Sequence, residues 1–509
     1  MMMRRLAFAC LFIAFCINLY GQEEALRVEI ETKFRSEEYQ VVPLNEHGLL
    51  LFVERKDKVL GGKNTWYFTH YNTDLEKVWE TQIQVNNWMD YQGFDTDGSQ
   101  LYLIFTRFAS EDFEFIKVDT KAQQAEKLKV PALSRLTFRE LKVMHGHAFV
   151  AGLAKNTPIL LNFNLNKGVA QEDLLKILPT STTKKSDFEF LDKDTTNQLI
   201  NFNFVNWKGG MSNLVIRSYD PSGEPLSEIA IPRTDDKNLL SGKQSITEEG
   251  NAVIIGTYAN GSSRLSDGLY ITEFDGEKQR YIRYYSFTDL QNFFNYLPEK
   301  QKLKMEKRKE KKESKNKDLN FQYRLLIHNL ISKNDKYTLI AEAYYPTYRY
   351  DNGTVWNGRV GFYNRYRYNY PMGSQRIFDG FQYTHAMLAS FSKDGKLEWD
   401  NSFELEQVKY FNLREVVKLH FDQDKVKLLY HYRGKLLSKV IEGNQVNSGK
   451  NEIPLTTDHE NDRVRRSYRS DLAFWYDNYF IAWGFQRIKN KEDEVKNTRN
   501  VFFFNKVPF

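Results

Sequence analysis

Apolar residues in this chain gather in short runs separated by polar turn residues. Many runs are apolar at consecutive positions, as in LLLFV from Leu49, YLIF from Tyr102 and VIIG from Val253. Successive side chains of a strand point to opposite faces of its sheet, so such runs are typical of strands that are covered on both faces. The pattern predicts β-sheets stacked against one another.

One sequence element, a polar turn followed by an apolar strand, recurs along the chain. Most copies are roughly fifty residues apart and two intervals are nearer ninety, and periods of this kind indicate a repeat fold. The eight copies begin at Asn45, Thr96, Met144, Lys193, Thr247, Lys333, Asp422 and Tyr476.

A second element follows the apolar strand in these units: a short strand, a tight polar turn and another strand. Several of these turns contain Asp-Gly, Asn-x-Gly or Pro-Ser-Gly, which are hairpin-turn sequences. Its copies begin at Tyr71, Val118, Phe163, Tyr219, Phe274 and Phe391, with a weaker one at Ile441. Each unit is therefore predicted to hold about four strands joined by hairpins.

Repeated four-stranded units of this length resemble those of the β-propeller superfamily, in the loose repeat style of bacterial exported proteins. The Gly-His and Trp-Asp marks of WD40 blades and the double glycine of kelch repeats are absent. The resemblance therefore implies a fold and no functional residue. We predict an all-β protein whose eight four-stranded blades form a β-propeller, with seven blades as the alternative.

The two ends of the chain are predicted to meet in one blade. The last copy supplies three strands, around Asp471–Trp475, Tyr479–Phe485 and Val501–Phe504, while ALRVEIETKF from Ala25 is a strand outside any unit. Pairing this strand with the last blade satisfies backbone groups that an open ring would leave unpaired.

Two expansions interrupt the repeat, and the first, at about residues 288–320, is basic. Its stretch Lys300–Lys317 has ten Lys or Arg against three Glu, an excess of seven that is larger than the formal net charge of +6 for the whole chain. Good helix formers without an apolar stripe predict an exposed charged helix or a contact for an anionic surface. The aromatic residues Phe293, Phe294 and Tyr296 are predicted to dock this segment. The candidate contact residues are Lys302, Lys304, Lys307, Arg308, Lys309, Lys311 and Lys312.

The second expansion, at about residues 346–379, is rich in tyrosine and arginine. Disordered segments are poor in aromatic residues, so this one is predicted either to cover the rim of the propeller or to recognise a partner. Tyrosine and arginine are enriched at the centres of binding interfaces. The candidate binding residues are Tyr348, Arg349, Tyr350, Trp356, Arg359, Tyr363, Arg365, Tyr366, Arg367, Tyr368 and Tyr370.

Topology places both expansions at the same end of the sheets. With strands lettered A to D from the axis outward, the basic segment joins strand D of the fifth blade to strand A of the sixth. The Tyr/Arg-rich segment joins strands B and C of the sixth blade. Because strands alternate in direction, D-to-A and B-to-C connections emerge on one face. We predict that the two expansions are neighbours there.

The N-terminus has the pattern of a signal peptide. Arg4 and Arg5 precede the apolar stretch Leu6–Ile17, which is too short to span a bilayer, and Gly21 offers a cleavage position. We therefore predict a signal peptide at residues 1–21, followed by a single propeller domain at residues 22–509 without a transmembrane helix.

Cysteine usage agrees with export. Both cysteines, Cys10 and Cys16, lie inside the predicted signal peptide, so the mature chain would have no disulfide, thiolate nucleophile or cysteine metal ligand. The bulky Phe15 disfavours a lipoprotein anchored at Cys16. A large exported protein without disulfides suits the periplasm, outer membrane or cell surface of a Gram-negative bacterium.

Catalytic motifs are weak. His145 and His147 lack an evident third metal ligand, and the loop from Asp95 has Thr106 where a calcium loop of the EF-hand type needs a glutamate. Nucleophile elbows, zinc-protease motifs and phosphate-binding glycine loops are absent. We therefore predict no catalytic residue, metal or cofactor.

The sequence favours a non-enzymatic exported propeller that acts as a binding, scaffold or accessory subunit at the cell envelope, through the face with the two expansions. The expected partner is a protein, with an acidic glycan or an anionic lipid surface as alternatives and no nucleic acid. A carbohydrate-active hydrolase or lyase with a site in the central funnel is the second hypothesis. A purely structural propeller is the third.

Overall fold

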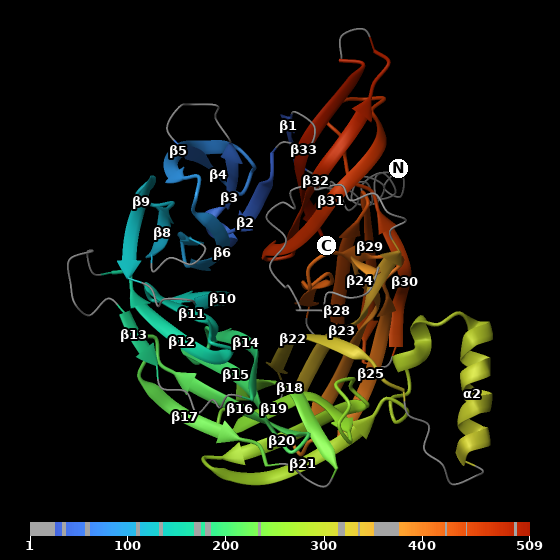
Figure 1. The fold of residues 1–509 in the computed structure, drawn as a ribbon. Coiled ribbons are helices and arrows are strands. Elements are labelled where there is room, and N and C mark those ends of the chain that lie inside the picture. Colours follow the sequence, from blue (N-terminus) through green and yellow to red (C-terminus); the bar gives the residue numbers. More distant parts are fainter. Residues whose placement is uncertain are drawn as a thin grey trace, which may run out of the picture.

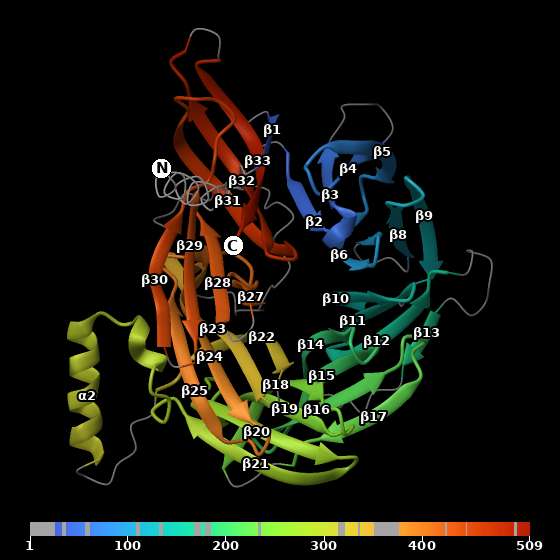
Figure 2. The ribbon, with the colours of Figure 1, turned by 180° about the vertical axis from the view of Figure 1, so that it is seen from behind.

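Eight antiparallel sheets form a ring around a central axis in the computed structural model (Figures 1 and 2), which confirms the predicted eight-bladed β-propeller. In each blade the strand nearest the axis, lettered A, is followed outward by B, C and D. The structure describes residues 26–32, 37–55, 62–107, 112–131, 136–166, 175–178, 185–232, 236–313, 321–333, 336–350, 376–422, 425–443, 445–492 and 496–509.

The first four blades follow the chain without interruption. Blade 1 contains β2 (Tyr39–Pro43), β3 (Leu49–Arg55), β4 (Lys63–Tyr71) and β5 (Lys77–Asn86), and blade 2 contains β6 (Asp90–Asp97), β7 (Gln100–Thr106), β8 (Asp112–Asp119) and β9 (Gln124–Pro131). Blade 3 contains β10 (Leu136–Met144), β11 (His147–Ala154), β12 (Thr157–Asn164) and β13 (Leu175–Leu178), and blade 4 contains β14 (Ser186–Asp194), β15 (Leu199–Lys208), β16 (Met211–Tyr219) and β17 (Pro225–Ala230).

The last four blades include both expansions and both ends of the chain. Blade 5 contains β18 (Lys237–Ile246), β19 (Ala252–Asn260), β20 (Gly268–Asp275) and β21 (Lys278–Ser286), and blade 6 contains β22 (Arg324–Lys333), β23 (Lys336–Tyr350), β24 (Arg376–Ser392) and β25 (Leu397–Glu404), with the short β26 (Lys409–Tyr410) also paired to β24. Blade 7 contains β27 (Lys418–Asp422), β28 (Lys425–Tyr432), β29 (Lys435–Glu442) and β30 (Gln445–Ile453), and blade 8 contains β31 (Arg463–Tyr476), β32 (Tyr479–Lys489), β33 (Thr498–Pro508) and β1 (Arg27–Glu31).

The continuous apolar runs fill the spaces between blades. In β3, Leu49, Leu51 and Val53 pack toward blade 8, whereas Leu50 and Phe52 pack toward blade 2. All five side chains are buried, because alternate residues of a central strand face opposite neighbours. The sequence pattern of strands covered on both faces is thereby confirmed.

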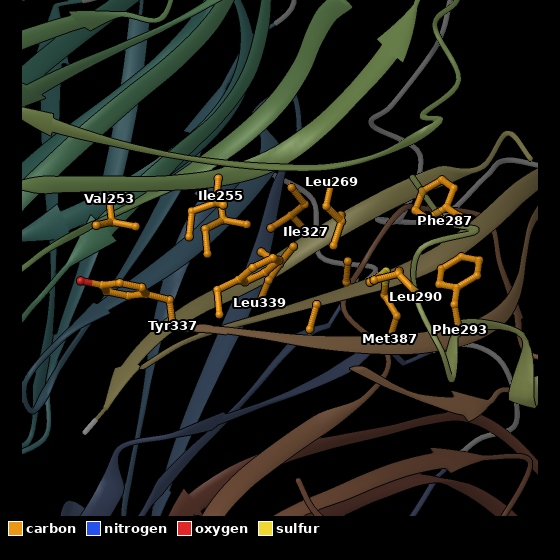
Figure 3. Close-up of a cluster of buried hydrophobic side chains, with 14 residues drawn as sticks. Val253, Ile255, Leu269, Phe287, Leu290, Phe293, Ile327, Tyr337, Leu339 and Met387 are labelled. Atoms are coloured by element: carbon orange, nitrogen blue, oxygen red, sulfur yellow. The ribbon is translucent and has the colours of Figure 1, made fainter. Parts of the chain in front are cut away.

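A buried apolar cluster lies at each of the eight blade junctions among the described residues. Figure 3 shows the cluster between blades 5 and 6. There, Ile255 of β19 and Leu269 of β20 meet Ile327 of β22 and Leu339 of β23. The ring is therefore continuous, with no junction left unpacked.

The ring closes through the predicted pairing of the two ends. β1 is the D strand of blade 8 and runs antiparallel to β33, with Arg27 opposite Asn505 and Glu31 opposite Val501. Across the same junction, Trp475 Nε1 of blade 8 donates a 2.9 Å hydrogen bond to the Gly48 carbonyl of blade 1.

The two ends of the ring differ in their connections. We call the end with A-to-B and C-to-D connections, such as residues 98–99, 195–198 and 220–224, the turn face. We call the end with D-to-A and B-to-C connections, such as residues 287–323 and 405–417, the loop face. All the recurring turns in the sequence belong to the turn face.

The basic expansion docks on the outer strand of blade 6. Asp400 of β25, a buried side chain, accepts 2.7 Å hydrogen bonds from the backbone N–H groups of Gln291 and Asn292. Phe293 in the short helix η2 (Phe293–Tyr296) stacks on Phe287 at 4.6 Å. The predicted docking by aromatic residues is confirmed.

Helix α2 (Glu299–Glu313) follows η2 and stands outside the ring (Figures 1 and 2). The side chain of Leu303 in this helix is 54% exposed. This exposure agrees with the predicted absence of an apolar stripe along the helix. No helix among the described residues is long and apolar enough to cross a bilayer.

Candidate functional site

Cations stacked on aromatic rings recur around the loop face. They occur on blades 1, 2, 4, 5, 7 and 8 and on the connection between blades 6 and 7. The pairs are Arg55–Tyr67, Arg107–Trp88, Arg264–Trp207, Lys237–Tyr258, Arg414–Tyr410, Arg433–Tyr432 and Arg469–Phe485, with 4.0 to 5.8 Å between cation and ring centre. Such pairs also occur elsewhere, for example Lys427 over Phe509 at the turn face.

A cavity of about 460 Å³ opens where blades 7, 8 and 1 meet the segment between blades 6 and 7. This volume is in the usual range for ligand pockets, about 300–1,000 Å³. Its walls combine aromatic rings with four cations and two carboxylates. They are Tyr39, Tyr410, Phe411, Tyr432, Tyr468, Trp483, Phe485 and Phe502, Lys409, Arg414, Arg433 and Arg469, and Glu38 and Asp471.

Both carboxylates of the cavity are ion-paired. Arg414 Nη2 lies 2.8 Å from Asp471 Oδ1, and Arg469 Nη2 lies 3.3 Å from Glu38 Oε1. Arg414 also stacks on Tyr410, 4.0 Å from the ring centre. Each carboxylate of the lining is therefore held by an arginine of the same cavity.

Tyr410 joins the cavity to blade 8. Its hydroxyl donates a 3.1 Å hydrogen bond to the Ser470 carbonyl, and burial raises the pKa of this tyrosine well above its usual range. Since β26 also pairs with β24, where Tyr410 lies opposite Phe381, Tyr410 connects the cavity to the strand that leads out of the Tyr/Arg-rich expansion.

A buried glutamate holds the segment that carries Arg414. Glu342 of β23 is completely buried and accepts hydrogen bonds from the backbone N–H groups of Val416, at 2.9 Å, and Val417, at 2.6 Å. The Nε2 atom of His328 lies 3.2 Å from the Glu342 carboxylate. Glu342 therefore positions the segment that forms one wall of the cavity, although Glu342 itself does not line the cavity.

The A strands of blades 2 to 6 and 8 share a feature that the sequence pattern did not predict, a register shift in their pairing with strand B. Such β-bulges are frequent beside functional sites. Past the bulges, Lys193 Nζ lies 2.6 Å from Asp95 Oδ2, and Lys243 Nζ lies 2.9 Å from Asp192 Oδ1. Four inner-strand charges are thus neutralised in pairs.

One inner-strand carboxylate is different. Glu189 lies at the β14 bulge and is reached by solvent. Desolvation of the carboxylate by the surrounding protein, and then the negative charge of Asp187, raise the pKa of Glu189 to about 8. The positive charge of Arg264 acts in the opposite direction. Asp187 itself accepts a 2.8 Å hydrogen bond from Trp207 Nε1. This cluster belongs to the loop side of blades 4 and 5.

The Tyr/Arg-rich expansion begins as a continuation of the sheet. β23 and β24 remain paired out to Tyr350 opposite Arg376, and the exposed side chains of Tyr348 and Arg349 lie on this extension. Lys409 Nζ lies 2.5 Å from Asp379 Oδ2, so the extension contacts the cavity wall. The other candidates, Trp356, Arg359, Tyr363, Arg365, Tyr366, Arg367, Tyr368 and Tyr370, lie outside the described residues.

The two expansions leave the ring at the predicted blade junction and then take different directions. α2 stands outside blade 6, whereas the extension of β23 and β24 contacts the segment beside the cavity. The basic candidates Lys302, Lys304, Lys307, Arg308, Lys309, Lys311 and Lys312 all belong to α2. Within the described part of the chain, none of these residues lines the cavity.

No group of three metal-ligating side chains occurs in the described part of the chain. The histidine pair serves the turn of blade 3: His147 Nδ1 lies 3.1 Å from Asn162 Oδ1, and His145 has a positive φ of 50°. Asp97 accepts a 2.9 Å hydrogen bond from the Gly146 N–H group.

No family model matches the chain, and no curated protein matches it in sequence. Among solved structures it is similar to the β-propeller domain of the Trilobed protease from Pyrococcus furiosus, with 10% identity, a TM-score of 0.35, and coverage of 80% of this chain and 96% of that one. It is also similar to polysaccharide lyase Uly1, with 8% identity, a TM-score of 0.39, and coverage of 94% and 100%. At these values the likeness does not extend to function.

Proposed function

We propose that this protein is a non-enzymatic binding propeller, exported to the bacterial cell envelope, that serves as a scaffold or accessory subunit and engages a protein partner through its loop face. The observation that carries the proposal is the aromatic and cationic cavity, surrounded on the same face by cation–aromatic pairs. Aromatic residues and arginine are the types that dominate binding energies at interfaces.

The charge pattern of the cavity supports binding rather than catalysis. Its two carboxylates both pair with arginines, whereas a general acid or base must be able to reach the proton that it transfers in a substrate. The turn face offers a contrast, because its connections are short and their polar side chains bond within the turns.

Capture from envelope extracts tests the proposal. A loop-face variant combines Trp88→Ser and Phe411→Ser, whose side chains are 45% and 62% exposed. A matched control combines Ile177→Ser and Leu226→Ser, which are 56% and 57% exposed and lie on outer strands. Proteins recovered with wild type and control should be lost with the loop-face variant. Equal recovery by both variants would refute the proposal.

The Glu189 cluster favours a second candidate function, a carbohydrate-active hydrolase or lyase in the funnel. A carboxyl group with a raised pKa is a candidate general acid, and Trp207 offers a ring on which a sugar could stack. Release of reducing ends from a panel of acidic and neutral polysaccharides tests it. Activity that is lost in Glu189→Gln would establish this function, and no release from any substrate would exclude it for that panel.

A further inference from the structure

Arg433 is the cation of the cavity without a carboxylate partner among the described residues. Lys409, Arg414 and Arg469 each face a carboxylate, at 2.5 to 3.3 Å. Arg433 instead stacks against Tyr432, 5.2 Å from the ring centre, and its side chain is exposed at the cavity edge. With Asp379 beside Lys409 counted, four cations face three carboxylates, which leaves one positive charge in excess at the cavity. The cavity is therefore complementary to an anion.

The turn that carries Arg433 is fixed in place. Arg433 and Gly434 form a two-residue hairpin turn with φ values of 52° and 77°, the left-handed conformation that such turns require. Blade 8 presses against this turn, since a Cβ atom on Gly434 would lie 2.3 Å from Ser467 Oγ. The guanidinium thus starts from a positioned backbone, which lowers the entropic cost of holding a ligand.

Aromatic rings form the wall next to Arg433. Tyr468 stacks on Phe485 with 5.5 Å between ring centres, and Phe485 packs edge-on against Phe502 at 5.2 Å. Trp483 is 8% exposed and contributes to the same wall, while Phe411 at the rim is 62% exposed. This wall can bury an apolar or aromatic side chain.

Most of the polar groups beside this wall already bond to one another, and Ser467 Oγ is a buried exception with no hydrogen-bond partner among the described residues. Arg414 pairs with Asp471, Arg469 pairs with Glu38, and the Tyr410 hydroxyl donates to the Ser470 carbonyl. A sugar brings hydroxyl groups that need hydrogen-bond partners when they are buried. An apolar side chain beside a carboxylate needs only ring faces and one cation. The available chemistry therefore matches an acidic, aromatic peptide better than a glycan.

We infer that this cavity anchors an acidic peptide segment of the partner, with a carboxylate on Arg433 and an apolar side chain against Trp483 and Phe485. The inference rests on the proposed function, because it names the chemistry by which a protein partner would bind the loop face. A planar guanidinium with its five N–H donors suits a carboxylate.

The probes are two fluorescein-labelled hexapeptides, one alternating phenylalanine with glutamate and the other alternating phenylalanine with glutamine. The full chain should bind the glutamate peptide about tenfold more tightly, as expected for one charge-assisted hydrogen-bonded pair. Arg433→Asn removes the cation and creates Asn-Gly, the most favourable sequence for this turn, so folding is preserved. This variant should bind both peptides equally, by fluorescence anisotropy.

Two controls separate the contributions. Arg107→Gln removes an exposed cation from the same face at blade 2 and should keep the preference for glutamate. Phe411→Ser should weaken the binding of both peptides to the same extent, because it removes aromatic surface and no charge. If Arg433→Asn retains the full preference, or wild type shows none, the inference is wrong.

A third probe, trigalacturonate, represents the glycan alternative. Binding of trigalacturonate that depends on Arg433, without binding of either peptide, would overturn the peptide assignment. The capture experiment with Trp88→Ser and Phe411→Ser remains independent of this result. If the partner is lost with the Trp88→Ser and Phe411→Ser variant but is still captured by Arg433→Asn, only the peptide inference is overturned. If both variants still capture the partner, the proposed function is overturned.

Discussion

The two faces of this propeller are built from the same repeating unit but by different means. On the turn face, Asp119 and Asp194 accept hydrogen bonds from backbone N–H groups two and three residues further along the chain. On the loop face, Glu342 holds backbone groups 74 and 75 residues away, and Asp400 holds groups 109 and 108 residues away. These two turns are stabilised by local hydrogen bonds, although other turns also bond across a blade junction, as Trp475 does to Gly48. The two loop-face connections are held by residues that are distant in sequence.

The difference shows where sequence change is tolerated. A turn that satisfies its own backbone can differ from its neighbours without effect on the other blades. A long connection held by a buried carboxylate cannot change so freely. Removal of that carboxylate leaves several N–H groups unpaired inside the protein.

Glu342→Ala should be the most destabilising change. It leaves the Val416 and Val417 N–H groups without an acceptor and His328 without a partner, at a cost of about 3 kcal/mol or more. Urea unfolding followed by tryptophan fluorescence measures this free energy. Glu342→Gln keeps one acceptor oxygen and should lose less. A loss below about 1 kcal/mol for Glu342→Ala would remove the distinction between the faces.

Asp462→Asn should lower stability by about 2 kcal/mol at neutral pH. Burial opposes ionisation of Asp462, yet hydrogen bonds from Arg499 and Asn490 outweigh it and lower its pKa from 3.8 to about 2. Arg499 contributes two of these bonds, at 2.8 and 2.6 Å.

The pH dependence of this difference has a definite sign. Because the folded pKa is depressed, the stabilisation is present above the unfolded pKa of 3.8 and is lost as the pH falls toward 2. Unfolding curves of wild type and Asp462→Asn should therefore converge between about pH 4 and pH 2. A difference that is unchanged over this window would mean that ionisation of Asp462 contributes nothing.

Asp194→Ala should cost about 1 kcal/mol, because two exposed backbone N–H groups can bond to water instead. Asp194→Asn retains an acceptor oxygen and should be close to wild type. Neither change should alter peptide binding or partner capture. Reduced binding in Asp194→Ala would show that the turn face participates in recognition.

Replacement of Lys304 and Lys307 together by glutamine should change the unfolding free energy by less than about 0.5 kcal/mol. Both side chains are exposed on α2, which stands away from the ring. Thermal unfolding of the double variant beside wild type measures the effect. A marked loss would reveal that α2 supports the fold.

Most of the ring could be predicted from the sequence because its signals are local. Turns such as that from Thr96 and apolar runs such as that from Leu49 specify hairpins and strands covered on both faces, whatever the rest of the chain does. The pairing of β1 with β33 also followed, since a strand left over at one end and a blade lacking one strand at the other satisfy each other.

The cavity could not be predicted, because its residues meet only in the closed ring. Glu38 and Arg414 come from two connections and Arg469 from β31, and these three segments are far apart in sequence. One local signal was available: Arg433 precedes Gly434 in a two-residue hairpin turn, where asparagine is the usual first residue. An arginine that accepts a left-handed conformation there is a candidate for a functional role.

The direction of the basic expansion was equally inaccessible. Connectivity places both expansions at one end of the sixth blade, as predicted, but the contacts of Asp400 with Gln291 and Asn292 lead the first along the outer strand. A buried aspartate in an outer strand has no recognisable sequence pattern. The expectation of two neighbouring expansions therefore rests on connectivity alone.

The closing blade also sets the order in which the protein acquires its properties during synthesis. Glu38 and Tyr39 are made early, yet they line the cavity together with Trp483 and Phe502, which are made near the end. A chain released too soon lacks the strands that complete both the ring and its cavity. The proposed recognition through this cavity would therefore depend on both ends of the ring, because neither set of lining residues forms the cavity alone.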